Sequence, residues 1–272
     1  MTIVLANANP TVAEPVDLEL VLAVDVSRSM DADEQALQRA GYIAAFRDPD
    51  VLQAVRQGPL ARIAVTYVEW AGAGLQQVVL PWTMIHDRAS TERVARALEA
   101  TPFERMRRTS ISDALLFSAQ LFGTGGFEGR RRIIDVSGDG PNNAGYPVLP
   151  ARDQVLAQGI TVNGLPIMLK RGYTGFFDVK NLDLYYEDCV IGGLGAFLVT
   201  VQHPDEFARA IRRKLILEIA GRVPPSRTVP ARIIPAQINP AQVTPAQVTG
   251  PSESTDCLIG EKLWDAWMHG AE

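Results

Sequence analysis

The segment LELVLAVDVSRS, residues 18–29, decides the fold. Its first nine residues, 18–26, form a nearly continuous apolar run, which is typical of a parallel strand covered on both faces. Residues 31–46 follow with acidic side chains in the first turn and apolar side chains at helical spacing, so we expect a helix there. A buried strand that leads directly into a helix predicts an α/β fold.

The rest of the sequence continues this alternation of strands and helices. Residues 62–70 and 76–82 read as strands, and the linker Ala71-Gly72-Ala73-Gly74 is too short for a crossover helix, so this pair predicts an antiparallel hairpin. The other expected strands are 132–136, 160–168 and 196–201, and the other expected helices are 87–100, 111–122, 149–158 and 204–220. We therefore predict a doubly wound, mostly parallel sheet with one antiparallel edge strand and helices on both faces.

Changes in composition divide the chain into four parts. We expect a leader at 1–15, a folded domain at 16–221, an extended proline-rich linker at 222–255, and a short amphipathic helix at 256–272. The linker holds seven prolines and a repeat with proline at every fifth position, which forbids a helix. The final helix would be marginal alone, so it is expected to dock, on its own domain by preference or else on a partner.

Charge and hydropathy exclude two classes of protein. The 26 basic and 31 acidic side chains give a net charge of −5, and no basic stripe offsets it, which argues against a nucleic-acid partner. No apolar run reaches the roughly 20 residues of a membrane-spanning helix, so we do not expect a transmembrane protein. Nothing in the sequence predicts the oligomeric state.

The compartment depends on the N-terminus and on two cysteines. Ala6-Asn7-Ala8 has the small-x-small form of a signal-peptidase site, but the basic start and long apolar stretch of a signal are not seen. We expect a periplasmic or secreted protein, with a cytoplasmic one as the alternative. An exported chain would favour a disulfide between Cys189 and Cys257, whereas a cytosolic chain would keep two thiols.

Five oxygen-bearing side chains lie at or just beyond strand ends that are expected to meet at one edge of the sheet. They are Asp25, Ser27, Ser29, Thr109 and Asp139. Two carboxylates and three hydroxyls, without histidine or cysteine, suit a hard divalent cation, Mg²⁺ above all. Taken alone, Asp25, Ser27 and Ser29 could instead form a strand-to-helix turn that caps the helix N-terminus, as aspartate and serine often do.

Three motifs in this order resemble the von Willebrand factor type A domain. They are D-x-S-x-S at 25–29, a threonine before the third long helix, and D-G at 139–140, and the resemblance runs from about 17 to 221. The phrases DVSGDGPNNAG (135–145) and YYEDCVIGG (185–193) look closer to an uncharacterised, mostly exported bacterial branch of that superfamily with no known activity. The resemblance implies a Rossmann-like fold with a metal-ion-dependent adhesion site.

The resemblance also implies a function. Ser27, Ser29 and Thr109 would ligate Mg²⁺ directly, with Mn²⁺ or Ca²⁺ as other candidates, and Asp25 and Asp139 would act largely through water. The ion would accept an acidic side chain from a protein partner, so the chain would be an adhesion or assembly module and not an enzyme.

One departure from the family pattern concerns the loop before Thr109. Many relatives carry glycine where this chain has Arg108, which is flanked by Arg105 and Arg107. These arginines would either recruit an acidic partner or form a solvated basic loop.

Two other functions are weaker alternatives. The site could be purely structural or vestigial in an otherwise conventional domain. A magnesium-dependent phosphohydrolase of the aspartyl-phosphate type would use Asp25 as nucleophile, but it needs a second carboxylate two residues later, where this chain has Ser27.

Overall fold

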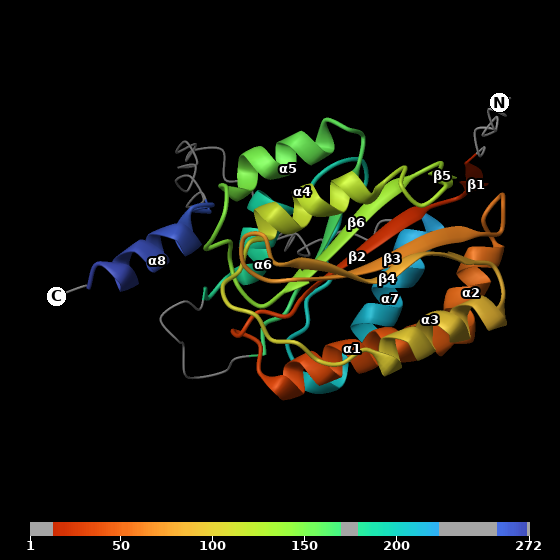
Figure 1. Cartoon of the computed structure of the whole chain (residues 1–272), viewed down its shortest axis with the longest axis horizontal. Helices are drawn as coiled ribbons and strands as arrows, with labels where there is room; N and C mark the ends of the chain where they lie inside the picture. The colour runs from red at the N-terminus through yellow and green to blue at the C-terminus, as the bar shows by residue number, and fades with distance from the viewer. Residues whose placement is uncertain (1–12, 170–178, 223–254, 271–272) are drawn as a thin grey trace, which may run out of the picture.

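A five-stranded sheet in the order β4-β3-β2-β6-β7 forms the centre of the computed structural model, which describes residues 13–169, 179–222 and 255–270 (Figure 1). The strands are β2 (Glu19–Asp25), β3 (Ile63–Trp70), β4 (Gln76–Ile85), β6 (Arg132–Gly138) and β7 (Thr161–Pro166). Neighbouring strands are parallel except β3 and β4, which are antiparallel. The predicted mostly parallel sheet with one antiparallel edge strand is confirmed.

Helices cover both faces of this sheet (Figure 1). One face carries α1 (Ala32–Arg47), α2 (Pro49–Arg56), α3 (Arg88–Ala100) and α7 (Phe207–Ala220). The other face carries α4 (Ile111–Leu121), α5 (Val148–Leu156) and α6 (Leu182–Tyr185). Helix α6 continues into a π-helical turn, Tyr186–Val190. Strand β2 shows why the central run is apolar throughout. Leu20 and Leu22 enter the core beneath the first group of helices, whereas Val21 and Ala23 enter the core beneath the second.

Several short elements were not expected from the sequence. Strand β1 (Glu14–Val16) pairs in parallel with β5 (Phe127–Gly129), and a 3₁₀ turn, Pro204–Glu206, precedes α7. Helix α2 follows α1 almost at once, because Asp48 caps its N-terminus and Pro49 occupies its first turn. Helix α8 (Ile259–Met268) lies within the predicted C-terminal helix. The leader to residue 12 and linker residues 223–254 lie outside the described residues.

The strand predicted at Ala196–Val201 is wrong. This segment runs beside β7 but forms only isolated bridges, at Leu198 and Val201. The regular ladder is interrupted because Pro166 has no backbone N–H to donate, so the bonds of Gly164 with Phe197 and Val199 stay separate from those that Val201 forms with Pro166 and Met168. None of the described helices combines the length and the apolar character needed to cross a membrane.

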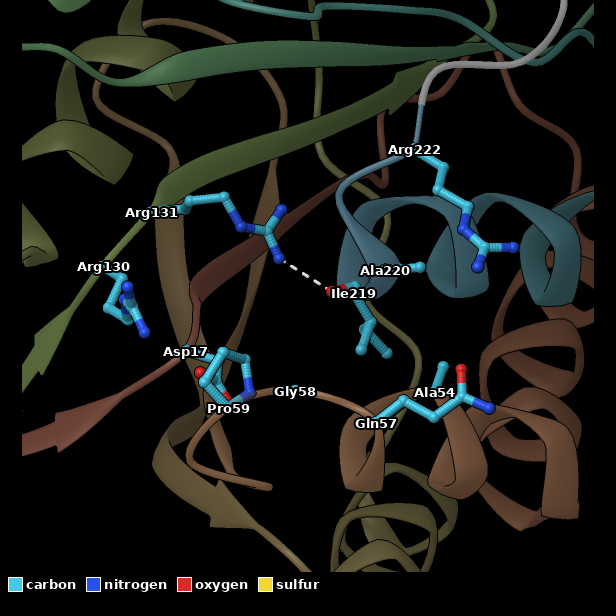
Figure 2. Close-up of a pocket in the computed structure, with 10 residues that line it drawn as sticks. All are labelled: Asp17, Ala54, Gln57, Gly58, Pro59, Arg130, Arg131, Ile219, Ala220 and Arg222. Carbon is cyan, nitrogen blue, oxygen red and sulfur yellow. Dashed lines mark hydrogen bonds between the residues drawn. The ribbon is translucent and has the colours of Figure 1, made fainter.

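A cavity of about 540 Å³ lies at the edge where β2 and β6 begin, against the ends of α2 and α7 (Figure 2). Arg131 reaches across it and donates hydrogen bonds of 2.7 Å to the carbonyl oxygens of Glu218 and Ile219. These carbonyls belong to the last turn of α7, where a helix leaves acceptors unsatisfied. This edge therefore fastens α7 to the sheet, and Asp25 lies at the opposite end of β2.

Candidate metal centre

The candidate residues gather where the strand order reverses. The chain passes from β2 to β3 on one side and from β6 to β7 on the other, so the carboxyl ends of the neighbours β2 and β6 border a crevice. Asp25 is the last residue of β2, and Asp139 directly follows β6. The two carboxylates are thus brought to one place from segments more than a hundred residues apart in sequence.

Hydrogen bonds connect four of the five predicted side chains. The hydroxyl oxygens of Ser27 and Ser29 lie 2.6 Å apart, and the Ser29 hydroxyl donates to Asp139 Oδ1 at 2.6 Å. The backbone N–H of Ser27 donates to Asp25 Oδ1 at 2.7 Å. The D-x-S-x-S loop therefore folds back on itself and reaches the loop that follows β6.

Thr109 is placed beside this group by its backbone. Its N–H donates to Asn143 Oδ1 and its carbonyl accepts from Asn143 N–H, both at 2.9 Å, which ties it to the loop that carries Asp139. On its other side, Met106 forms a parallel bridge with Ser27. Within the described part of the chain, the Thr109 hydroxyl makes no hydrogen bond to the other four side chains. The structure therefore brings Thr109 to the same edge without joining its hydroxyl to the hydrogen-bonded group.

The electrostatics of the group centre on Asp25. Its side chain is fully buried, and its Oδ2 has no hydrogen-bond partner among the described residues. Burial, followed by the negative charge of Asp139, raises the pKa of Asp25 to about 8, although the Ser27 N–H partly opposes this shift. A cation beside both carboxylates would relieve their repulsion and supply a partner for the orphaned oxygen.

A tyrosine that sequence reasoning missed lies over this carboxylate. A Cβ added at Gly138 would lie 2.8 Å from the Tyr186 hydroxyl and 2.9 Å from Asp25 Oδ2, so both atoms crowd the same glycine. Tyr186 is fully buried, and its pKa is raised well above the usual value by burial and then by Asp25. The YYEDCVIGG stretch was noticed only for its resemblance, and nothing in its spacing pointed to the end of β2.

The donor chemistry of the group fits a hard cation. Across the described ranges, no cluster of three or more His, Cys, Asp or Glu side chains could hold a metal ion. The candidate centre instead offers two carboxylates and three hydroxyls, which are oxygen donors of the kind Mg²⁺ and Ca²⁺ prefer and zinc sites rarely use alone.

The asparagines after Asp139 hold the surrounding loops together. Asn142 is fully buried: its Oδ1 accepts from Ser112 N–H at 3.0 Å, and its own N–H donates to the Tyr185 hydroxyl at 3.1 Å. With Asn143 on Thr109, the two amides fix the Asp139 loop against the start of α4. The sequence predicts a turn here, with a role at the rim of the site as the alternative.

The arginines next to Thr109 have structural partners of their own. The Arg108 guanidinium donates to the Asn143 carbonyl at 2.6 Å, and Arg105 donates to the carbonyls of Arg28 and Met30 at 3.2 and 2.6 Å. Both side chains nevertheless remain exposed at the surface. They join the loops of the candidate centre and give its rim a positive charge.

The C-terminal helix is fastened next to this rim. Cys189 in the π-helical turn forms a disulfide with Cys257, which settles the alternative left open by the sequence. Helix α8 then contacts its own domain, as preferred: Asn142 Nδ2 donates to Glu261 Oε1 at 2.8 Å, and Arg108 lies 3.9 Å from the centre of the Trp264 ring.

The doubly wound sheet, with loops that meet at its switch point, has the fold of solved von Willebrand factor type A structures. The chain belongs to the family described as "Protein of unknown function (DUF1194)", whose model matches residues 15–223. No curated protein matches the chain in sequence.

Solved structures share the fold at low sequence identity. Proximal thread matrix protein 1 from the mussel byssus, with a zinc-occupied MIDAS motif, is 15% identical with a TM-score of 0.55 over 76% of this chain and 49% of that one. A von Willebrand factor type A protein from Catenulispora acidiphila is 14% identical with a TM-score of 0.53 over 75% of this chain and 43% of that one. The pilus adhesin SpaC from Lactobacillus rhamnosus GG is 12% identical with a TM-score of 0.56 over 76% of this chain and 30% of that one. The match thus spans half or less of each of these proteins.

Proposed function

We propose that this chain is a divalent-metal-dependent protein-binding module. The observation that carries the proposal is the hydrogen-bonded group at the switch point, in which the Ser29 hydroxyl lies 2.6 Å from the Ser27 hydroxyl and 2.6 Å from Asp139 Oδ1. The buried, repelled carboxylate of Asp25 beside them supports a cation at this place. The zinc-occupied MIDAS motif of the mussel protein supports metal binding by this fold in general.

Each side chain has a role in this proposal. Ser27, Ser29 and Thr109 would hold Mg²⁺ directly, while Asp25 and Asp139 would hold it through water, and Mn²⁺ or Ca²⁺ could replace it. When bound, the ion supplies an electrophilic centre that can take up a carboxylate. Hydroxyl ligands carry no charge, so they leave the ion available for an acidic side chain of a protein partner.

The surroundings support a protein partner outside the cytoplasm. The exposed arginines at the rim would attract an acidic segment and orient it toward the centre. The disulfide favours an oxidising compartment, and the mussel byssus protein and the pilus adhesin are extracellular by their descriptions. We therefore place the chain in the periplasm or outside the cell.

A binding role is favoured over catalysis by the residue two positions after Asp25. An aspartyl-phosphate enzyme needs a proton-shuttling carboxylate there, and Ser27 cannot serve at neutral pH. We therefore propose that the chain is not an enzyme.

Calorimetric titration with Mg²⁺ and with Mn²⁺ tests the proposed metal centre. The wild type should bind one ion, and Asp25→Ala and Asp139→Ala should lose this binding while circular dichroism shows an unchanged fold. Asp113→Asn is the matched control, because Asp113 lies at the same edge but bonds to Gly74 N–H at 3.0 Å instead. Equal heats for the wild type and Asp25→Ala would favour a purely structural or vestigial site.

A further inference from the structure

Helix α8 is built into the rim of the candidate metal centre. It contacts the loops that carry Asp139 and Thr109. Asn142, three residues after Asp139, donates a hydrogen bond to Glu261, and the guanidinium of Arg108, next to Thr109, stacks on the Trp264 ring. An arginine over an aromatic ring and a buried amide on a carboxylate are specific contacts. The helix therefore lies beside the centre and is attached to both of its flanking loops.

The position of α8 is fixed by covalent and steric constraints. The disulfide anchors Cys257 to the π-helical turn that also holds Tyr186. Gly260 is buried against the Asn142 carbonyl so closely that an added Cβ would have to displace that backbone. A helix of ten residues would be marginal in water, so these contacts are what keep it formed and in place.

The outward side of α8 carries two large apolar side chains next to the charged Lys262 and Asp265. Trp267 and Met268 are 54% and 56% exposed, and the Trp267 ring lies 5.1 Å from that of Trp264, which Arg108 covers from the domain side. Large apolar side chains exposed together beside a charged rim are typical of a protein-interaction surface, and tryptophan contributes strongly to such surfaces.

The charge of the same rim indicates the partner. Arg28, Arg105, Arg107 and Arg108 are all exposed, and they lie in the two loops that surround Ser29 and Thr109. A partner segment that suits both features is acidic where it meets the arginines and the metal centre, and apolar where it meets α8.

We propose that α8 forms one wall of the partner-binding surface. The partner is a protein segment that presents an acidic side chain to the metal centre and, next to it, an aromatic or aliphatic side chain to Trp267 and Met268. This inference rests on the proposed function and adds to it the apolar half of the recognised segment. The surface is continuous, because Arg108 contacts both the Asp139 loop and α8.

The test selects a binding segment directly. A displayed library of random peptides is selected on the full, oxidised chain in Mg²⁺, and an enriched peptide is synthesised and titrated. We expect an aspartate or glutamate next to an aromatic or aliphatic residue. The double variant Trp267→Ser/Met268→Ser should bind this peptide about tenfold more weakly or worse, with unchanged Mg²⁺ titration.

A matched control variant, together with the same peptide titration repeated in EDTA, separates this inference from the proposed metal-dependent function. Leu194→Ser removes an apolar side chain that is 97% exposed near the start of β7, at the other edge of the sheet, and should leave peptide affinity unchanged. If metal-dependent peptides bind the double variant as tightly as the wild type, α8 is not part of the binding surface, whereas the proposed metal-dependent function stands. If peptide affinity depends on Trp267 and Met268 but is the same in EDTA, α8 is part of the binding surface and the metal-dependent function is overturned. A selection that enriches no peptide would overturn both.

Discussion

Two pairs of buried carboxylates lie along the same strand, β6, and they are balanced in different ways. In the middle of the strand, Asp135 lies with Glu218 of α7, and Lys214 forms ion pairs with both. At the end of the strand, Asp139 lies with Asp25, and the carboxylate of Asp25 accepts a hydrogen bond from the neutral N–H of Ser27. All three members of the first group are at most 1% exposed, whereas Ser29 at the second is open to the surface.

The difference concerns where the counter-charge comes from. In the closed core, the chain must carry its own cation, since an unpaired buried charge costs several kcal/mol. At the open edge, Asp25 Oδ2 has no hydrogen-bond partner among the described residues, and under the proposed function an ion from solution would meet it. The core group is thus structural, whereas the group at the edge is the proposed place of an exchangeable ion.

Removal of the internal cation should have the largest effect. Lys214→Met leaves Asp135 and Glu218 buried without their ammonium and should lower the free energy of unfolding by about 3–5 kcal/mol in urea denaturation. Arg96→Ala is the control, because its pair with Glu92 has the same four-residue spacing but Arg96 is 75% exposed, so the loss should stay below about 0.5 kcal/mol.

Asp25→Asn, measured in EDTA, provides the other half of this comparison. It removes a buried, repelled charge whose pKa is raised in the fold, so at neutral pH it should raise the free energy of unfolding or leave it unchanged, and should not lower it. A loss as large as that of Lys214→Met would mean that the two regions do not differ as described.

The pH dependence of stability should also test the electrostatics of the core group, through the change that Glu218→Gln makes in it. Burial, followed by the charge of Asp135, raises the pKa of Glu218 from 4.5 to about 7, although Lys214 opposes the shift. Between these values the folded chain holds a proton that the unfolded chain has lost, so stability falls as pH rises from about 4.5 to about 7. Glu218→Gln should remove this part, by up to about 1.4 kcal/mol per pH unit in denaturation curves. Parallel curves for the variant and the wild type would contradict the shift.

A methyl group added at Gly138, the last residue of β6, should disturb the packing around Asp25 and leave the Lys214 group unchanged. Gly138→Ala places a carbon 2.8 Å from the Tyr186 hydroxyl and 2.9 Å from Asp25 Oδ2, so it should cost roughly 1–3 kcal/mol of stability and weaken Mg²⁺ binding. Gly140→Ala, two residues later, meets no atom within 4 Å and should change neither thermal unfolding nor the Mg²⁺ titration. Equal effects of both variants would show that crowding at Asp25 is not the cause.

The sheet and the edge that carries the candidate centre were predictable because both follow from local patterns. The apolar run of β2, the short hairpin linker and the polar residues at the strand ends need only strand periodicity and the rule that ligands gather where parallel strands end. The Asp48-Pro49 start of α2 could also have been recognised, since aspartate before proline is a helix-start signal.

The contacts between distant segments were beyond the sequence. The charge of Asp135 in an apolar strand indicates that it is paired, but only the packing of α7 on β6 places Lys214 and Glu218 beside it in the core. The pairing of Cys189 with Cys257 stayed open because it depended on the compartment. The segment 196–201 has strand composition, yet Pro166 of β7 cannot donate to it, and strand periodicity does not reveal which strand the segment would pair with.

The disulfide changes how the chain would carry a mechanical load. Cys189 and Cys257 are separated by 68 residues, and the loop they close includes the proline-rich stretch. Tension applied beyond α8 would therefore pass through the sulfur bridge into the turn that holds Tyr186, next to Asp25, and would bypass the end of α7. A pull on this end would therefore act first on the turn that holds Cys189 and Tyr186.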